Sequence, residues 1–246
     1  MRRLIISDIH ANLEALQAVV RDAEGQYDSV VCLGDVVGYG ADPNAVCEWV
    51  RENAAAIIRG NHDKACCGLE EPVLFNPVAR FAVEWTYEEL SDDNRKWLRE
   101  LPVGPSDLGD FVIAHGSVLD EDEYLIDAQD AASQFPHVLG RLVFFGHTHV
   151  QGGFFLRSSE DGKGGEAPDE TEKHGVRLRP GDTALVNPGS VGQPRDLEWE
   201  SGYALYDSET REVVYRRCPY DVAACQKKIF EAGLPPALAE RLSIGR

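Results

Sequence analysis

The chain has 246 residues, enough for one large domain or two small ones, and its 42 acidic residues outnumber its 24 basic residues to give a net charge of −18. Such a surface lacks the basic footprint of proteins that follow a nucleic-acid backbone, so neither a long nucleic acid nor an anionic membrane is expected as a partner. No apolar run reaches the roughly 18 residues of a membrane span. The N-terminal apolar run is interrupted by Asp8 before it could form a signal peptide, so a cytoplasmic location is expected.

Short apolar runs alternate with helical periodicity over the first sixty residues. The runs 4–6, 30–33 and 56–58 predict strands, and segments 13–20 and 43–50 between them carry apolar residues at helical spacing. Strands that are apolar on both faces and alternate with helices indicate βαβ units around a buried parallel sheet.

The middle of the chain predicts helices over 78–100 and strands at 111–113 and 142–145. Strand-like patterns then follow one another at 153–156, 176–179, 183–187, 203–206 and 212–216. With turn residues between them, these patterns predict a second, largely antiparallel sheet.

Two further segments complete the expected organisation. Residues 157–174 are polar and glycine-rich and are expected to form a mobile surface loop, and residues 220–242 are expected to form a helical C-terminal tail. Because no repeat or linker is visible, residues 1–246 are expected to form a single domain. None of the six cysteines forms a C-x-x-C pair, which predicts reduced, buried thiols.

Metal-capable side chains follow five of the predicted strands. They are Asp8 with His10, then Asp35, then Asn61 with His62 and Asp63, then His115, and finally His147 with His149. The carboxyl ends of strands in open α/β sheets are where ligand sites form. Since residues i and i+2 of an extended chain project to the same side, the two members of each D-x-H or H-x-H pair are expected to point together.

The surrounding residues and the mixture of ligand types support a metal site. Gly34, Gly60 and Gly146 precede ligand candidates and permit the tight turns and close backbone approach that a converging site needs. Carboxylate, amide and imidazole ligands suit two divalent ions, with Mn, Fe, Zn, Ni or Co as the options. Seven ligands exceed the needs of one tetrahedral ion and fit two ions that share a carboxylate, the arrangement used for phosphoester displacement.

In this order, the motifs resemble the five blocks of the calcineurin-like metallophosphoesterases: Asp8-x-His10, Gly34-Asp35, Gly60-Asn61-His62-Asp63, His115-Gly116 and Gly146-His147-Thr148-His149. The segment 187–192 also resembles a turn in the smaller bacterial and archaeal phosphodiesterases of that family. The resemblance implies an α/β fold, a four-layer αββα sandwich of two mixed sheets flanked by helices.

The resemblance also implies roles for individual residues. Two sets of three ligands would share Asp35 as a bridge: Asp8, His10 and His149 for one ion, and Asn61, His115 and His147 for the other. His62 would lie over the site and protonate the leaving oxygen or stabilise its charge, with Asp63 orienting it. A hydroxide held between the two metals would attack the phosphorus.

The expected function is therefore a two-metal phosphoester hydrolase, a phosphodiesterase acting on small phosphodiesters or nucleotides. A dinucleoside polyphosphate hydrolase and a phosphomonoesterase are the alternatives within the same chemistry, and a scaffold protein on the same fold is the non-enzymatic one. The acidity disfavours a nuclease. Arg195 is interpreted as a solvated surface side chain, with contact to a substrate phosphate as the alternative, and the acidic run 120–123 as a solvated loop.

Overall fold

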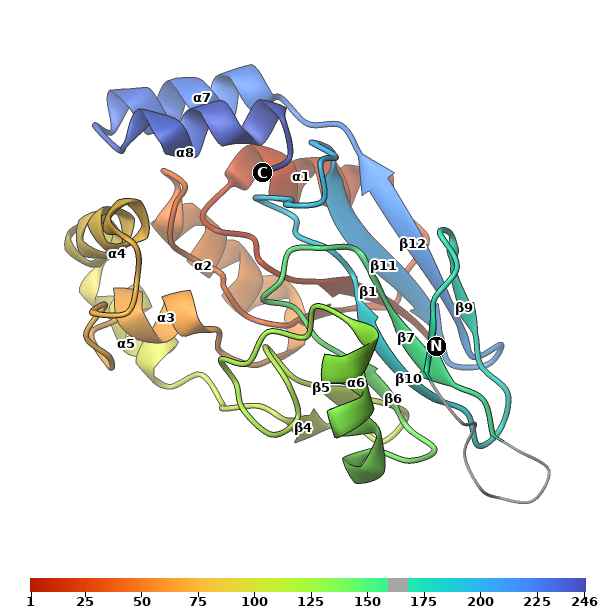
Figure 1. Cartoon of the computed structure of the whole chain (residues 1–246). Helices are drawn as coiled ribbons and strands as arrows, with labels where there is room; N and C mark the ends of the chain where they lie inside the picture. Colours follow the sequence, from red (N-terminus) through yellow and green to blue (C-terminus); the bar gives the residue numbers. More distant parts are fainter. Residues whose placement is uncertain (159–167) are drawn as a thin grey trace.

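The computed structural model describes residues 1–158 and 168–246 (Figure 1). The first part of the chain contains β1 (Arg2–Ile6), α1 (Leu13–Asp22), β2 (Ser29–Cys32), α2 (Pro43–Asn53), β3 (Ala54–Ile57), α3 (Asn61–Cys66), α4 (Pro77–Glu89), α5 (Asp92–Arg99), β4 (Ser106–Asp107) and β5 (Val112–Ile113). The rest contains α6 (Ala128–Gln134), the 3-10 helix η1 (Phe135–His137), β6 (Leu142–Phe144), β7 (Gly152–Leu156), β8 (Asp169–Glu170), β9 (Gly175–Arg177), β10 (Thr183–Asn187), β11 (Ser201–Asp207), β12 (Glu212–Cys218), α7 (Val222–Glu231), α8 (Pro236–Glu240) and the 3-10 helix η2 (Arg241–Ser243).

Local signals explain where several helices begin. The Asn12 side chain accepts a hydrogen bond from Ala15 N and caps α1, and Ser91 caps α5 in the same way. Helix α2 starts with Pro43 at its first position, where a missing N–H is harmless. The preceding Asp42 makes no capping hydrogen bond with its side chain, because that carboxylate binds Lys228 of α7 at 2.8 Å.

The strands form two six-stranded mixed sheets with the orders β3-β2-β1-β11-β12-β9 and β4-β5-β6-β10-β7-β8. Strands β1, β2 and β3 are parallel, as are β5 and β6. The expected separate antiparallel sheet beyond residue 150 is wrong, since β9, β11 and β12 join the first sheet while β7, β8 and β10 join the second, with β10 parallel to β6. Alternation identifies a strand, but backbone pairing between distant segments decides its neighbours.

Three apolar layers separate four structural layers. Ile5, Phe111, Phe144 and Tyr206 belong to the layer between the two sheets. A second layer lies between the first sheet and helices α1, α2 and α7, and a third between the second sheet and α6. Figure 1 shows α1 and α7 on one side of the molecule and α6 on the other. The predicted four-layer αββα sandwich is therefore confirmed.

The expected surface loop at 157–174 falls partly outside the described residues, because 159–167 are not among them. On its C-terminal side, β8 pairs with β7, so this part of the segment is a strand rather than a loop. The expected helical tail at 220–242 contains α7, α8 and most of η2. All six cysteines are buried and free. Among residues 1–158 and 168–246, no helix has the length and apolar character needed to cross a bilayer.

Candidate metal centre

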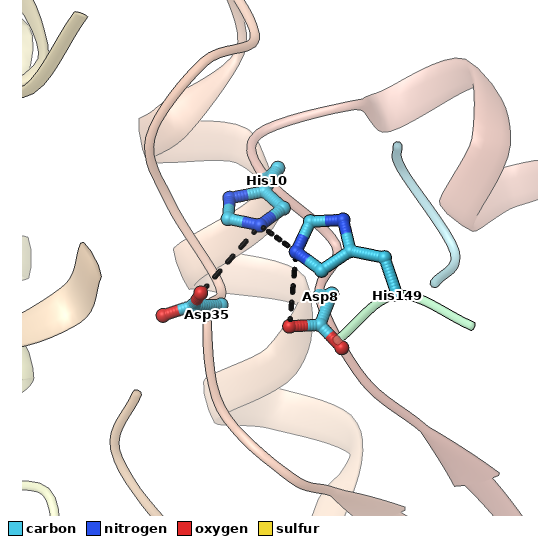
Figure 2. A group of neighbouring side chains, drawn as sticks. All are labelled: Asp8, His10, Asp35 and His149. Carbon is cyan, nitrogen blue, oxygen red and sulfur yellow. Dashed lines mark hydrogen bonds and ion pairs between the residues drawn. The ribbon is translucent and has the colours of Figure 1, made fainter. Parts of the chain in front are cut away.

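The loops that follow β1, β2, β3, β5 and β6 bring all seven predicted ligands to one place. The side chains form two groups, and within each group all the ligand atoms lie within 4.8 Å of one another. The first group is Asp8, His10, Asp35 and His149, and the second is Asp35, His115 and His147. Figure 2 shows the side chains of the first group converging. The remaining predicted ligand, Asn61, has its Oδ1 3.3 Å from His115 Nε2. Asp35 is the member that the two groups share.

The backbone at these ligands is left-handed rather than extended. Five of the seven have φ between 49° and 66°: Asp8, His10, Asp35, His147 and His149. The expected i, i+2 geometry of an extended chain is therefore wrong as the reason for convergence, because the strands have already ended. Backbone hydrogen bonds between loops hold the turns instead, including His10 N to the Asp35 carbonyl at 3.0 Å. Each such conformation costs on the order of 1–3 kcal/mol and persists only because contacts with the surrounding structure hold the backbone in place.

Two glycines allow the carboxylates to lie directly against neighbouring loops. A Cβ on Gly60 would lie 2.1 Å from Asp35 Oδ1. A Cβ on Gly146 would lie 2.0 Å from Ser7 Oγ and 3.0 Å from Asp8 Oδ2. These contacts confirm that glycine is needed at both positions for close approach.

Backbone carbonyls fix the rings of the four ligand histidines. The ring nitrogens involved and their carbonyl partners are His10 Nδ1 with Val37 (3.0 Å), His115 Nδ1 with Leu33 (2.8 Å), His149 Nδ1 with Gln193 (2.6 Å) and His147 Nε2 with Asp122 (3.1 Å). A carbonyl oxygen only accepts, so each ring carries a hydrogen on that nitrogen and, when neutral, presents a lone pair on the other. This is how proteins orient histidine for metal binding.

The first group is arranged for a cation. His10 Nε2 and His149 Nε2 lie 3.1 Å apart, and burial holds the pKa of both rings well below the usual range, so two lone pairs face each other. His10 Nε2 also lies 3.5 Å from Asp35 Oδ2, and His149 Nε2 lies 3.4 Å from Asp8 Oδ1. All four side chains are almost completely buried. These lone pairs and carboxylate oxygens repel one another, and a divalent ion bound between them would attract all of them.

In the second group, a proton on His115 compensates the negative charge of the Asp35 carboxylate. Burial opposes protonation of His115, but the Asp35 carboxylate raises the pKa of His115 to about 10. Burial likewise opposes ionisation of Asp35, yet the His115 charge holds the pKa of Asp35 well below its usual range. His115 Nε2 lies 3.5 Å from Asp35 Oδ2. A metal ion that binds here competes with this proton.

His62 lies beside both groups and is held differently. Its backbone N–H donates to Asp35 Oδ1 at 2.8 Å, while its ring packs against Tyr39 and Phe75 with centroid distances of 4.3 and 4.8 Å. The ring Nδ1 is buried and has no hydrogen-bond partner in the described part of the chain. Burial lowers the pKa of His62 to about 4, so its ring is neutral near pH 7.

Asp63 acts on the backbone. Its Oδ1 accepts hydrogen bonds from Val36 N (2.8 Å) and Val37 N (3.2 Å), and its Oδ2 accepts one from Gly60 N (2.9 Å). The described residues contain no hydrogen bond from this carboxylate to the His62 ring, which the expected orienting role would require. Asp63 instead ties the loop after β2 to the start of α3.

A cleft of about 400 Å³ opens over the second group, and Asn61, His62 and His147 face it. Its walls are built by other segments and include Tyr39, Leu74, Phe75, Tyr124, Arg195 and Arg241. The interpretation of Arg195 as a solvated surface residue is therefore corrected. A larger hollow of about 570 Å³ lies beside the paired Arg217 and Asp196 and contains none of the predicted ligands.

Besides Leu74, which precedes Phe75 in the chain, three wall residues went unrecognised in the sequence. Phe75 contacts the His62 ring, Tyr124 stacks on His147 with centroids 3.9 Å apart, and Arg241 comes from η2 near the end of the chain. No motif or spacing marks them, since each is brought in by a separate connection.

The acidic run 120–123 is also more than a solvated loop. Glu121 accepts two hydrogen bonds from Arg59, at 2.7 and 3.0 Å, and Asp122 forms an ion pair with Lys64. The Asp122 carbonyl is the group that holds the His147 ring. Asp120 and Asp122 are exposed, as expected of a solvated loop, but the segment is also clamped to the residues around α3 and positions a ligand of the second group.

The segment 187–192 is hydrogen-bonded to the loops that carry Asp8 and His147. Asn187 Nδ2 donates to the Gly146 carbonyl at 2.8 Å and to Thr148 Oγ1 at 2.9 Å, while Ser190 Oγ donates to the Asp8 carbonyl at 2.8 Å. These contacts hold the backbone on either side of the ligands and assign the segment a structural role.

Comparison with known proteins agrees with this geometry. Residues 1–211 match the family model of the calcineurin-like phosphoesterase superfamily domain. An uncharacterised protein from Methanocaldococcus jannaschii is 36% identical over 253 residues, which cover 98% of this chain and 97% of the relative.

Two solved structures extend the comparison. A metallophosphoesterase from Sphaerobacter thermophilus is 40% identical, with a TM-score of 0.85 and coverage of 100% of this chain and 99% of that one. A hypothetical protein from Pyrococcus horikoshii OT3 is 19% identical and shares the fold, with a TM-score of 0.78 and coverage of 100% and 98%. With its family match, its relatives and its two groups of metal-capable ligands, the chain belongs to the calcineurin-like phosphoesterase superfamily.

Proposed function

We propose that this member of the superfamily is a phosphodiesterase that hydrolyses small phosphodiesters or nucleotides with the help of two divalent metal ions. The observation that carries the proposal is the shared position of Asp35, which belongs to both groups of ligand atoms beside an open cleft. When bound, two such ions neutralise charge on phosphoryl oxygens and lower the pKa of a bound water.

Each ion would be held by one of the two groups of ligands. One ion would be held by Asp8, His10 and His149, the other by Asn61, His115 and His147, and both by Asp35. Nitrogen and oxygen donors without a thiolate suit Mn, Fe, Zn, Ni or Co. Because Asn61 and His147 face the cleft and the histidines of the first group are not among its lining residues, the ester would enter on the side of the second group.

His62 is the residue placed to assist departure of the leaving group. Its ring faces the cleft, and its buried Nδ1 has no partner among the described residues. A neutral imidazole can donate a hydrogen bond to an ester oxygen. The negative charge of a bound phosphate would also raise the pKa of His62 and so favour proton transfer to that oxygen.

The shape of the cleft supports a diester over a simple monoester. Apolar wall surface comes from two separate segments, Leu74 with Phe75 on one and Tyr124 on the other. A diester has two organic groups that such walls can cover, whereas a monoester has only one. Burial of organic groups against aromatic side chains also gives orientation to the reacting phosphate.

The test is a substrate panel on protein that has been stripped of metal and reloaded with Mn²⁺, Ni²⁺ or Zn²⁺. We expect kcat/KM to be larger for bis(p-nitrophenyl) phosphate than for p-nitrophenyl phosphate or a dinucleoside polyphosphate. A preference for either of the last two would replace the diesterase with that alternative. Absence of turnover with every metal would favour a scaffold protein.

A further inference from the structure

Two arginines stand together in the wall of the cleft. Arg195 lies half-buried there, and its Nη2 donates to Gln193 Oε1 at 3.0 Å and to Tyr39 Oη at 3.5 Å. Arg241, the first residue of η2, lines the same cleft. The two charges are close enough to affect each other, because burial and then the Arg195 charge lower the pKa of Arg241.

Neither guanidinium forms an ion pair with a side-chain carboxylate of the described residues, although Arg241 contacts the main-chain oxygen of Arg246, the last residue of the printed sequence. Arg195 has only neutral partners, and its Nε is buried without a hydrogen bond. Arg241 donates from its Nε to the backbone oxygen of Arg246. In a chain with 42 acidic residues, these two arginines bring positive charge to one wall of the cleft without a paired Asp or Glu side chain among the described residues.

The acidic side chains of the cleft contact Lys64 rather than either arginine. Glu70 and Asp122 both line the cleft, and both bind Lys64, with Glu70 Oε2 3.0 Å from its Nζ. One wall therefore keeps its acidic groups on Lys64 and stays slightly negative, whereas the other wall presents the two arginines. Adjacent like charges repel, and an anion between them relieves that repulsion while accepting charge-assisted hydrogen bonds.

Arg241 belongs to a part of the chain that the family model does not include. The match ends at residue 211, and Arg241 follows helices α7 and α8. Figure 1 shows these two helices packed side by side next to α1, and the Lys228 ion pairs with Glu14 and Asp42 tie α7 to the body of the protein. The C-terminal helices thus deliver a cation to a cleft whose floor the family domain builds.

We propose that Arg195 and Arg241 form a subsite for a second phosphate group of the substrate, separate from the phosphate that reacts. This inference rests on the proposed function and narrows it to small phosphoesters that carry an additional phosphate. A guanidinium binds two phosphate oxygens at once in a planar fork, which suits a terminal phosphate held at a defined distance from the reacting one.

The test uses two chromogenic substrates that differ by one phosphate: thymidine 5′-(p-nitrophenyl phosphate) and its 3′-phosphorylated derivative. The metal-loaded full-length protein should show a KM about tenfold lower for the 3′-phosphorylated substrate, as one charge-assisted contact would give. Arg241→Gln should remove most of this preference, and Arg241→Lys should retain part of it. As a second measurement, thymidine 3′,5′-bisphosphate should inhibit more strongly than thymidine 5′-phosphate in the unaltered protein, and about equally in Arg241→Gln.

The matched control is Arg179→Gln, which removes an exposed arginine from the turn before β10 and should leave both KM values unchanged. Circular dichroism and the unfolding midpoint establish that each variant is folded. Equal KM values for the two substrates in the unaltered protein, or an equal loss for both in Arg241→Gln, would overturn the subsite.

Failure of the proposed function gives a different result, namely no p-nitrophenol from either substrate. Titration calorimetry with thymidine 3′,5′-bisphosphate and thymidine 5′-phosphate then decides the subsite without turnover. Tighter binding of the bisphosphate that Arg241→Gln abolishes would support it, and equal binding of the two nucleotides would contradict it.

Discussion

The floor and the walls of the cleft are built in different ways. Every floor ligand follows the end of a strand of the two sheets, between residues 8 and 149, and the ligand histidines are pinned by backbone carbonyls. The walls come from the connection between α3 and α4, from the loop before α6, from Arg195 and from η2. The comparison teaches that the sheets position the ligand candidates, whereas the walls come from connections, the part of a fold where specificity commonly resides.

The two regions also differ in what stabilises them. The floor gathers buried carboxylates and imidazoles whose mutual repulsion a divalent cation would relieve, so its stability should rise when a metal binds. The walls are held by packing and ion pairs that need no metal, and Leu74 at their rim is 91% exposed. A change in the floor should therefore affect metal content and turnover together, whereas a change in a wall should affect affinity or specificity.

The largest effect is expected for Asp35→Asn. Loss of the shared negative charge should reduce the metal content below two ions per chain and lower kcat by at least about 10³-fold, in the range lost when a main electrostatic contact of a transition state is removed. Elemental analysis and steady-state kinetics measure both. Asp28→Asn, which alters an exposed carboxylate paired with Arg2, should change neither. Two tightly bound ions in the Asp35 variant would show that the floor does not depend on a shared ligand.

His62→Gln should separate catalysis from metal binding within the floor. Both ions should remain, because the His62 ring belongs to neither ligand group, while kcat falls by about 10²–10⁴-fold for an alkyl ester whose leaving oxygen needs a proton. The loss should be much smaller for p-nitrophenyl esters, which leave as stable anions. A kcat that stays unchanged with alkyl esters would rule out proton donation by this residue.

Lys64→Met tests the junction between floor and wall. Lys64 binds Glu70, Glu121 and Asp122, and the Asp122 carbonyl orients His147. Without this amine, one of the two ions should bind roughly tenfold more weakly, as is typical when a group that orients a ligand is removed. Metal titration monitors the change, with Lys96→Met on exposed α5 as the control. Unchanged affinity for both ions would mean that the acidic loop holds His147 without Lys64.

The smallest effect is a pH trend in stability. Burial raises the pKa of Asp8 to about 7, so the folded metal-free chain keeps a proton that the unfolded chain has lost above about pH 4, and stability falls as pH rises over this interval. The raised pKa of His115, about 10, contributes stability that is present below about pH 6.5 and is lost toward pH 10. Below about pH 6.5 the buried rings of His10 and His149 act in the opposite direction, because their lowered pKa values keep them neutral in the folded chain, so the fall in stability is expected above pH 6.5.

Metal binding replaces these protons, so the rise in unfolding midpoint caused by Mn²⁺ should be several degrees larger at pH 8.5 than at pH 5.5. Thermal unfolding with Mn²⁺ and with EDTA across this range measures the difference. A metal-induced shift that shrank with rising pH would mean that the floor groups do not exchange protons for metal.

Much of the floor could be predicted from the sequence, and the walls could not. Asp8, Asp35, Asn61, His115 and His147 each follow an apolar run, and parallel strands necessarily place their carboxyl ends at one edge. The reason first suggested for the convergence of Asp8 with His10 was nevertheless wrong, since both adopt a left-handed backbone. Side-chain direction after a strand depends on hydrogen bonds between loops, which are not local in sequence.

Local patterning therefore determined the ligand set, most helices and most strands, because apolar periodicity and residue chemistry are properties of short segments, while the sandwich class was implied by the family resemblance. Only the tertiary structure decided how the late strands divide between two sheets, what Asp63 and the acidic run hold, and which residues line the cleft. Arg195 and Arg241 are 46 positions apart in the printed sequence, and packing of the C-terminal helices alone makes them neighbours. Contacts at such separations come from the fold as a whole, which no single segment encodes.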